Sequence, residues 1–571
     1  MFLPTTNKEV TALGWDYIDV ILFSGDAYVD HPAFGIAVIA RVLESIGLRV
    51  AVVPQPNWRD DLRDFKKLGT PRLFFGVSAG AMDSMVNHYT STKRIRSNDA
   101  YTPGGIAGQR PDYALKVYSE IIKSLYPHTP LVVGGIEASL RRFSHYDYWQ
   151  NTVLPSMLQQ TKADLLVYGM GEKPMKQIAL ELQKGTSVSD IRGVPQTMYA
   201  CGVIPQDLGE HILLHSFEEC KKSKTAYAEN FVQIEQQSNA WKAQSIVQKS
   251  NNEYIIAVPP SQGPAMDTKE LDFVYDLPFT RQPHPRYKKK KPIPAYEMIR
   301  DSVTIHRGCF GACSFCTISA HQGKFVTSRS EQSVINELKK VQGTPGFKGH
   351  VTDLGGPSAN MYNMKGKDLR MCMACKRPSC IFPNVCNNLH TSHEALTALY
   401  QKASEVKGIK HITIGSGVRL DLLQGSKGER AYLKRLVSKH ISGRLKVAPE
   451  HTQNSVLALM RKPSFDSFKK FKRSFEQMQQ TTGQKQQLVP YFISAHPGCT
   501  KQDMAMLSRT FSEFGIRAEQ VQDFTPTPMT LATTMYYTGI DPYTKKKVYV
   551  ARSKSEKDEQ KSFFFSRTKQ R

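Results

Sequence analysis

Three cysteines at the spacing C-x3-C-x2-C, Cys309, Cys313 and Cys316, constrain this chain more than any other feature of its sequence. They follow residues 302–306, an alternating, β-branched stretch that is typical of a strand, so we expect them on a loop at a strand's end. Thiolates at this spacing can hold a [4Fe–4S] cube, and three of them leave one iron open to a bound molecule. The alternatives are an incomplete zinc knuckle and three buried free thiols.

The first part of the chain, residues 1–205, alternates between short apolar runs and segments of helical periodicity. Apolar runs separated by helices predict a parallel sheet that is covered on both faces, and hence a Rossmann-like N-terminal domain. Such sheets bind ligands where their strands end, and small residues follow the runs here. The runs are residues 17–23, 49–54, 72–77, 131–135 and 164–168.

A second α/β domain is predicted over residues 295–544, where six strand-length runs alternate with helical segments. This order fits a partial (β/α)6 barrel, with functional groups gathered at the strand ends. Between the two domains, residues 206–294 are polar and then rich in proline and lysine, which predicts a loosely packed connector. The basic residues 545–571 are expected to be a disordered tail. The six runs are residues 303–306, 350–354, 411–415, 445–448, 488–493 and 518–524.

Four further cysteines, Cys372, Cys375, Cys380 and Cys386, have the spacing C-x2-C-x4-C-x5-C. Four thiolates can saturate one Zn²⁺ ion or ligate all four irons of a second cube, and the spacing does not choose between the two. The basic residues 376–377 would lie beside this negatively charged site, so a nucleic-acid-binding knuckle is a third alternative.

The first cysteine loop, with Phe315 before its last cysteine, resembles the signature of the radical S-adenosylmethionine (SAM) superfamily. Four phrases, at residues 24–35, 134–143, 355–362 and 377–380, resemble the YgiQ-type family of radical SAM proteins. This resemblance extends over nearly the whole chain, and residues 545–571 are the least covered. It implies no particular substrate.

The resemblance implies that Cys309, Cys313 and Cys316 hold a [4Fe–4S] cluster and that SAM is the exchangeable ligand of its open iron. It places Phe315 near the adenine of SAM. An electron from the cluster would cleave SAM to a 5′-deoxyadenosyl radical, which abstracts hydrogen from a substrate. The protein's part is to bind and orient the cofactor and to exclude side reactions.

A pair of glycines, Gly355 and Gly356, follows the second strand of the predicted barrel. In radical SAM proteins a Gly-Gly-Glu-like stretch at this place binds the amino group of SAM. Here Pro357 stands in place of the glutamate, so the carboxylate is missing, although the two glycine carbonyls could still accept from the ammonium.

Three later strand ends offer further candidates. The turn at residues 415–419 could line the SAM site or be a simple tight turn. Glu450 could meet SAM or substrate, or it could cap the next helix. Cys499 could donate a hydrogen atom to a substrate radical, or it could be a packing residue.

The N-terminal half also resembles the cobalamin-binding domain that precedes the catalytic core in many radical SAM proteins. The cobalt-ligating pattern D-x-H-x-x-G is missing, because Asp30 and His31 are adjacent and Gly35 is misplaced. Cobalamin binding and a degenerate domain that only shapes or covers the active site are both open, since fold analogy does not carry function.

Composition bears on partners and compartment. A net charge of +25 favours polyanions such as RNA, although charge alone is a weak signal. Seven of the ten cysteines lie in two tight clusters, which suits metal ligation in a reducing cytoplasm better than disulfides. No stretch reaches the apolar length of a membrane span, and no secretory signal is visible.

The sequence therefore predicts a cytoplasmic radical SAM enzyme that acts on an unassigned substrate and takes electrons from a flavodoxin- or ferredoxin-like donor. Two alternatives remain. One is a metal-clipped RNA-binding protein without radical catalysis, and the other is a radical SAM enzyme that modifies RNA.

Overall fold

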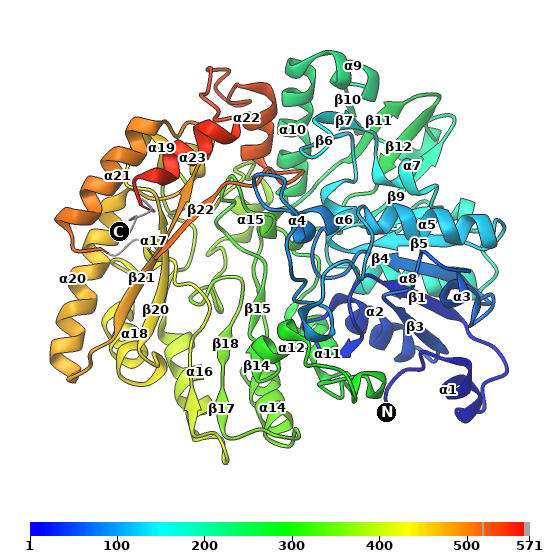
Figure 1. Ribbon diagram of the computed structural model, residues 1–571, viewed down its shortest axis with the longest axis horizontal. Helices are drawn as coiled ribbons and strands as arrows, with labels where there is room; N and C mark the ends of the chain where they lie inside the picture. Colours follow the sequence, from blue (N-terminus) through cyan, green and yellow to red (C-terminus); the bar gives the residue numbers. More distant parts are fainter. Residues whose placement is uncertain (517–518, 565–571) are drawn as a thin grey trace, which may run out of the picture. The chain divides into compact units, whose positions relative to one another are not determined.

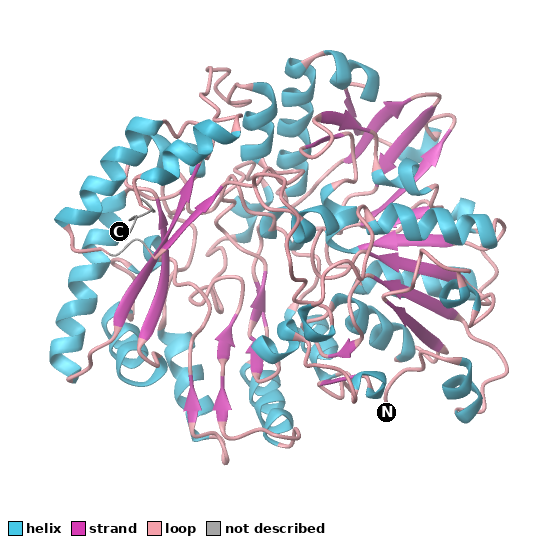
Figure 2. Cartoon of the chain, in the orientation of Figure 1, coloured by secondary structure: helices cyan, strands magenta, loops and turns pink. Residues whose placement is uncertain are grey.

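The structure is a computed structural model that describes residues 1–516 and 519–564. The chain divides into two compact units (Figure 1). The N-terminal unit comprises residues 1–238 and 242–300, and the C-terminal unit comprises residues 239–241 and the chain from residue 301 onward. Helices flank the strands in both units, which confirms the predicted α/β class (Figure 2). Among the described helices, none is long and apolar enough to cross a membrane.

The N-terminal unit is built on a nine-stranded sheet with the order β10-β11-β12-β9-β8-β5-β4-β1-β3. Five neighbouring strands of this sheet are parallel, as predicted. Their residues are almost all buried, because helices such as α2 (Gly35–Glu44) and α5 (Ala114–Leu125) cover them. The five strands are β3 (Val50–Pro54), β1 (Val20–Ser24), β4 (Phe74–Ser78), β5 (Leu131–Gly134) and β8 (Leu165–Val167).

The predicted connector, residues 206–294, is a packed part of this unit instead. Its strands extend the sheet, and helix α10 (Lys224–Ser238) buries Phe231 and Ile234. Short runs of consecutive apolar residues in its strands, 246–247 and 255–257, are buried, so a segment that is polar overall still packs. The strands of this segment are β10 (His211–Leu214), β11 (Ser245–Ser250) and β12 (Glu253–Ala257), and β9 (Thr197–Cys201), which precedes the segment, joins them to β8.

The C-terminal unit contains the predicted succession of strands and helices. Strand β14 pairs with β18, β17 with β19, and β20 with β21 and then β22, all in parallel. Residue 518, where the sixth strand was predicted to begin, lies outside the described residues. The strands are β14 (Ser302–Thr304), β17 (His350–Val351), β18 (Asp353–Gly355), β19 (His411–Ile412), β20 (Arg444–Glu450), β21 (Gln487–Ser494) and β22 (Gln520–Asp523).

Helices join these strands and carry the apolar core of the C-terminal unit. The longest, α20, buries phenylalanines at helical spacing, which gives it one apolar face. The main helices are α14 (Glu331–Gln342), α16 (Glu394–Glu405), α18 (Glu429–Arg435), α20 (Phe465–Thr482) and α21 (Lys501–Glu513).

The predicted disordered tail is ordered as far as residue 564. Helix α23 (Lys554–Ser562) begins with a capping box and buries Gln560, whose amide donates a 2.7 Å hydrogen bond to the Cys499 carbonyl. The expectation was wrong over residues 545–564 because polar contacts, rather than an apolar stripe, attach this helix. Residues 565–571 of the predicted tail lie outside the described residues.

Candidate functional site

The cysteine loop leaves the carboxyl end of β14, as predicted. Strand β15 (His306–Arg307) pairs with β16 (Thr327–Ser328) and closes the base of the loop. Within the loop, the Cys316 amide donates to the Cys313 carbonyl at 3.0 Å, and the Cys309 amide donates to the Gly323 carbonyl at 3.2 Å. The three cysteines therefore share one short loop at a strand end.

The three thiols also share one electrostatic environment. Burial raises the pKa of Cys309, and the Arg419 guanidinium opposes this rise. Burial, Cys313 and Cys309 together raise the pKa of Cys316 to about 12. The N–H of Gly311 lies 3.4 Å from the Cys309 sulfur and favours its thiolate. Crowded thiols of this kind are a donor set that metal binding converts to thiolates.

Arg419, from the loop after β19, reaches this cysteine loop. Its guanidinium donates to the Cys313 sulfur at 3.2 Å and to both carboxylate oxygens of Asp421 at 3.0 and 2.6 Å. The backbone N–H of Arg419 donates to Asn360 Oδ1 at 2.7 Å. Although burial opposes it, Arg419 holds the pKa of Asp421 below its usual value. The guanidinium is thus fixed as a hydrogen-bond donor to the Cys313 sulfur.

The paired glycines are packed tightly against side chains of the same unit. A Cβ on Gly355 would lie 2.5 Å from Ser416 Oγ, and one on Gly356 would lie 2.6 Å from the His306 ring. The Gly355 carbonyl already accepts from the Ile305 amide at 2.8 Å. The close packing of Ser416 against Gly355 and of His306 against Gly356 therefore requires glycine at both positions. The role of the two glycines toward SAM stays a prediction.

Residues at the ends of β20 and β21 also contact the cysteine loop. His496 Nε2 lies 2.9 Å from Ser314 Oγ, and its ring meets Phe315 edge-on at 6.1 Å. The buried Cys499 sulfur lies 3.5 Å from His451 Nε2. Phe315 therefore packs at the edge of the barrel core, and its place near an adenine stays a prediction.

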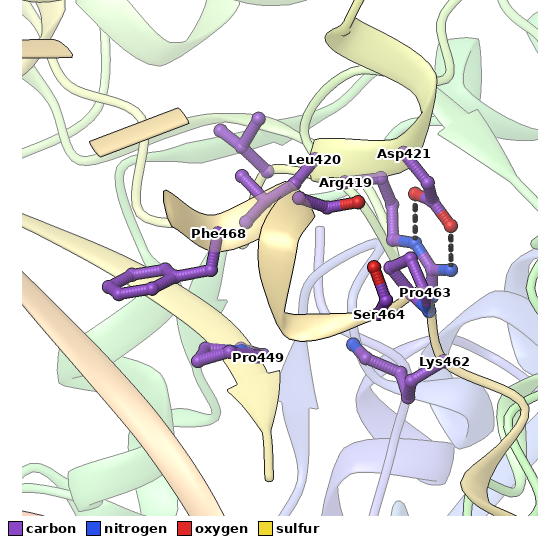
Figure 3. Close-up of a pocket in the computed structure, with 11 residues that line it drawn as sticks. Arg419, Leu420, Asp421, Pro449, Lys462, Pro463, Ser464 and Phe468 are labelled. Atoms are coloured by element: carbon purple, nitrogen blue, oxygen red, sulfur yellow. Dashed lines mark hydrogen bonds and ion pairs between the residues drawn. The ribbon is translucent and has the colours of Figure 1, made fainter. Parts of the chain in front are cut away.

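A pocket beside the loop is lined by two positively charged side chains, those of Arg419 and Lys462 (Figure 3). Arg419 and Asp421 form one side, and Lys462 lies on another. Lys462 Nζ is 3.6 Å from the Glu450 carboxylate. Burial raises the pKa of Glu450 against the influence of Lys462. The pair of Lys462 with Glu450 is therefore weaker than the bidentate pair of Arg419 with Asp421. Glu450 therefore pairs with a lysine and does not cap the following helix, whose N-terminal residue Gln453 makes no side-chain cap.

The second cysteine set is also gathered in the structure. The Cys375 amide donates to the Cys372 carbonyl at 3.2 Å, and the Cys386 amide donates to the Cys380 carbonyl at 2.8 Å. Burial and the Cys375 and Cys386 thiols raise the pKa of Cys372, and burial raises that of Cys380 to about 11. Among the described residues, neither set brings three His, Cys, Asp or Glu donors to the spacing of one bound ion.

The strand ends of the N-terminal unit do not fit cobalamin. Behind β1, Asp26 lies 2.8 Å from Arg110, which also pairs with Asp99 at 2.9 Å. A Cβ on Gly80 would lie 2.1 Å from the Asp26 carboxylate, so the chain's own groups fill this end of the sheet. His31 is buried, and burial lowers its pKa well below the usual value. His31 is therefore enclosed within this unit rather than exposed at a strand end.

Sequence reasoning missed several polar residues of the barrel's strand ends. Asp353 is one of them, and it accepts from Ser416 Oγ at 2.5 Å and from the Gly415 amide at 2.8 Å. Burial raises its pKa. An acidic residue inside an apolar strand, two positions before a glycine pair, was the available signal. Lys462 gave no signal, because only the fold brings it to Glu450.

Comparisons with known proteins agree with this architecture. Residues 2–302 match the family model described as radical SAM N-terminal, and residues 519–569 match a domain of unknown function, DUF3362. The first match ends within two residues of the boundary between the two units.

Two relatives match almost the whole chain. A UPF0313 protein of Bacteroides thetaiotaomicron is 54% identical over 583 residues, which cover 99% of this chain and 94% of that protein. A UPF0313 protein of Porphyromonas gingivalis is 55% identical over 573 residues, which cover 99% and 90%.

The chain is similar in fold to a solved structure. That structure is the radical SAM methyltransferase TsrM of Kitasatospora setae with cobalamin and a [4Fe–4S] cluster bound. The TM-score is 0.50 at 15% identity, over 90% of this chain and 77% of TsrM. At this identity the likeness concerns the fold alone.

Proposed function

This chain belongs to the UPF0313 family of radical SAM proteins, and from that premise we propose that it is a radical SAM enzyme whose cluster is held by Cys309, Cys313 and Cys316. The observation that carries the proposal is the Arg419 guanidinium aimed at the Cys313 sulfur within a loop of three crowded thiols. When bound, the cluster would supply the electron that cleaves SAM to a 5′-deoxyadenosyl radical.

The residues around the loop supply hydrogen-bond donors that would favour thiolate ligands once a metal is bound. Arg419 donates to one sulfur, the Gly311 amide approaches another, and Asp421 keeps the guanidinium in place. Such partners orient metal ligands and tune the charge at the site.

We infer that the pocket with Lys462 receives the carboxylate of SAM. Lys462 and Arg419 provide positive charge beside the loop, and both are held by carboxylates of the same unit. The Gly356 backbone, at the end of β18, is the matching candidate for the amino group. The substrate would then enter at the strand ends of the barrel.

The test is anaerobic reconstitution with iron and sulfide, followed by measurement of 5′-deoxyadenosine formed from SAM and dithionite. We expect the wild type to form it and the triple variant Cys309→Ala/Cys313→Ala/Cys316→Ala to lose the activity about 1,000-fold or more, because no ligand remains. Cys201→Ala, in the N-terminal unit, is the matched control and should keep the activity. A triple variant that still cleaves SAM would overturn the proposal.

The positive charge of the chain favours an RNA substrate within this reaction class. Comparing modified nucleosides in total RNA of a deletion strain and its parent tests this choice. Loss of one modified nucleoside supports RNA modification, and identical profiles speak for a protein or small-molecule substrate. The cytoplasm, where a cluster of this kind stays reduced, is the expected compartment.

A further inference from the structure

The second cysteine set lies in one short segment. Cys372, Cys375, Cys380 and Cys386 follow one another at short intervals, as the cysteines of iron–sulfur runs do, and this spacing also suits zinc. The choice between the two metals therefore depends on the surroundings of the four thiols. All four are partly exposed and none is in a disulfide.

The fold ties the two ends of this segment together. Asn388, two residues beyond Cys386, extends its side-chain amide to 3.4 Å from the Cys372 sulfur. The Cys386 amide bonds to the Cys380 carbonyl at 2.8 Å. A Cβ on Gly366 would lie 2.4 Å from the Cys372 sulfur, so glycine leaves the space that this thiol occupies. The first and last cysteines therefore lie on the same side of the segment.

The same segment is built onto the first cysteine loop. The Cys380 amide donates to the Phe310 carbonyl at 3.1 Å, and the Ser379 hydroxyl lies 2.9 Å from the carbonyl oxygens of Phe310 and Gly311. Phe310 and Ile381 belong to one apolar cluster, against which Cys309, Cys380 and Cys386 also pack. Two thiol sets in direct structural contact are suited to passing an electron between them.

Residues 365–377, which we call the rim of the second set, are apolar and basic. Helix α15 (Leu369–Met373) exposes Leu369, Met371 and Met373 by 45, 60 and 39%. Residues 365–377 contain five lysines and arginines and one aspartate. An exposed apolar patch beside such charge fits an acidic protein partner.

We propose that Cys372, Cys375, Cys380 and Cys386 hold a second iron–sulfur cluster and that an acidic one-electron donor protein docks on α15 to reduce it. One electron leaves the donor and enters this cluster, and no bond forms or breaks. The metal site goes beyond the radical SAM activity and does not depend on it.

Metal content of the full chain tests the site. After anaerobic reconstitution we expect about eight irons per wild-type chain and about four in Cys375→Ala or Cys380→Ala. The EPR signal that remains in these two variants should still change on addition of SAM. The control Cys201→Ala should keep about eight irons.

The triple variant Cys309→Ala/Cys313→Ala/Cys316→Ala separates this proposal from the proposed function. It should keep about four irons on the second set. If only the radical SAM assignment fails, the wild type has about four irons and loses them in Cys375→Ala. One zinc ion per chain that disappears in Cys375→Ala, or wild-type iron content in that variant, would overturn the second cluster.

Docking is tested with an acidic flavodoxin as the probe. We expect the double variant Met371→Ser/Lys376→Glu to raise the Kd about tenfold or more, and added salt to weaken wild-type binding. Lys407→Glu, an exposed lysine outside the rim, is the matched control and should keep the wild-type Kd. Equal affinity of the wild type and the rim variant would overturn the docking site.

Discussion

The two units end their parallel strands in opposite ways. In the N-terminal unit, Arg110 is shared by Asp26 and Asp99, and the whole group is buried. In the barrel, the guanidinium of Arg419 donates to the Cys313 sulfur and is itself paired with Asp421. At the first strand end the charges of the chain's own side chains balance each other. At the second, three thiols that could ligate a metal lie in one loop.

This difference separates a strand end that is suited to binding a ligand from one that is not. A parallel sheet collects polar groups at its carboxyl edge in either case. In the N-terminal unit the chain itself supplies the counter-charges. The polar groups at this edge therefore stabilise the fold, and glycines such as Gly80 make room for them. Where thiols crowd together and raise each other's pKa, the edge has the donor set that the proposed cluster needs. The four predictions below test this contrast.

Lowering the pH should unfold the C-terminal unit, which contains the barrel, before the N-terminal unit. This is the largest expected effect. Burial lowers the pKa of five barrel histidines to about 4 or about 3. Because an unfolded histidine titrates near 6.5, the unfolded chain binds more protons between pH 6.5 and about 4. Stability therefore falls as the pH falls through this window. The five are His306, His393, His440, His451 and His496.

Hydrogen exchange followed by mass spectrometry at pH 7, 5.5 and 4.5 measures this effect in each unit. The N-terminal unit has fewer such residues, with His145 at about 4 and lowered pKa values at His31 and His284. Buried carboxyls with raised pKa act in the opposite direction, but each unit contains them, for example Asp26 and Glu450. Earlier opening of N-terminal peptides would contradict the comparison.

Arg141→Met should destabilise the N-terminal unit by about 3–5 kcal/mol, because it leaves two buried carboxylates without their cation. Arg141 donates to Asp83 and to Asp147, each at 2.8 Å, and all three side chains are buried. Urea unfolding followed by hydrogen exchange gives the change in the free energy of unfolding. Arg63→Met, which removes an exposed pair with Asp61, is the control and should change nothing measurable. An equally small effect at Arg141 would mean that this network is not a brace.

The sequence predicted those parts of the molecule that depend on short-range pattern. The strand end that leads to Cys309 and the six barrel strands follow from spacing and periodicity. Residues 206–294 and the helix near Gln560 were missed because hydrogen bonds and a thin apolar face attach them. The contact of Arg419 with Cys313 joins residues 106 positions apart, and strand order rather than local sequence creates it.

Arg419→Met should weaken cluster retention about 10–100-fold, as loss of an outer partner of a metal ligand does. The variant removes the donor to the Cys313 sulfur and leaves Asp421 buried without its cation. The rate of iron loss to a chelator measures retention without relying on turnover. Arg430→Met, at an exposed position of α18, is the matched control. Unchanged iron loss in Arg419→Met would remove the guanidinium from the site.

Lys462→Met should have the smallest effect, about 1 kcal/mol near pH 6, even though Lys462 and Glu450 are both buried. Burial already raises the pKa of Glu450, so this carboxyl can take up a proton when the lysine is gone. The folded variant then binds more protons than the unfolded chain, and its loss of stability grows as the pH rises.

Urea unfolding at pH 6 and pH 8 checks this prediction. The double variant Lys462→Met/Glu450→Gln should recover most of the stability and lose the pH dependence, because no charge remains to be buried. Lys469→Met, which removes the surface pair with Asp466, is the control. A loss of several kcal/mol at both pH values would show that Glu450 stays charged. The barrel's strand ends would then be braced in the same way as those around Arg141, and the contrast between the two units would rest on the cysteines alone.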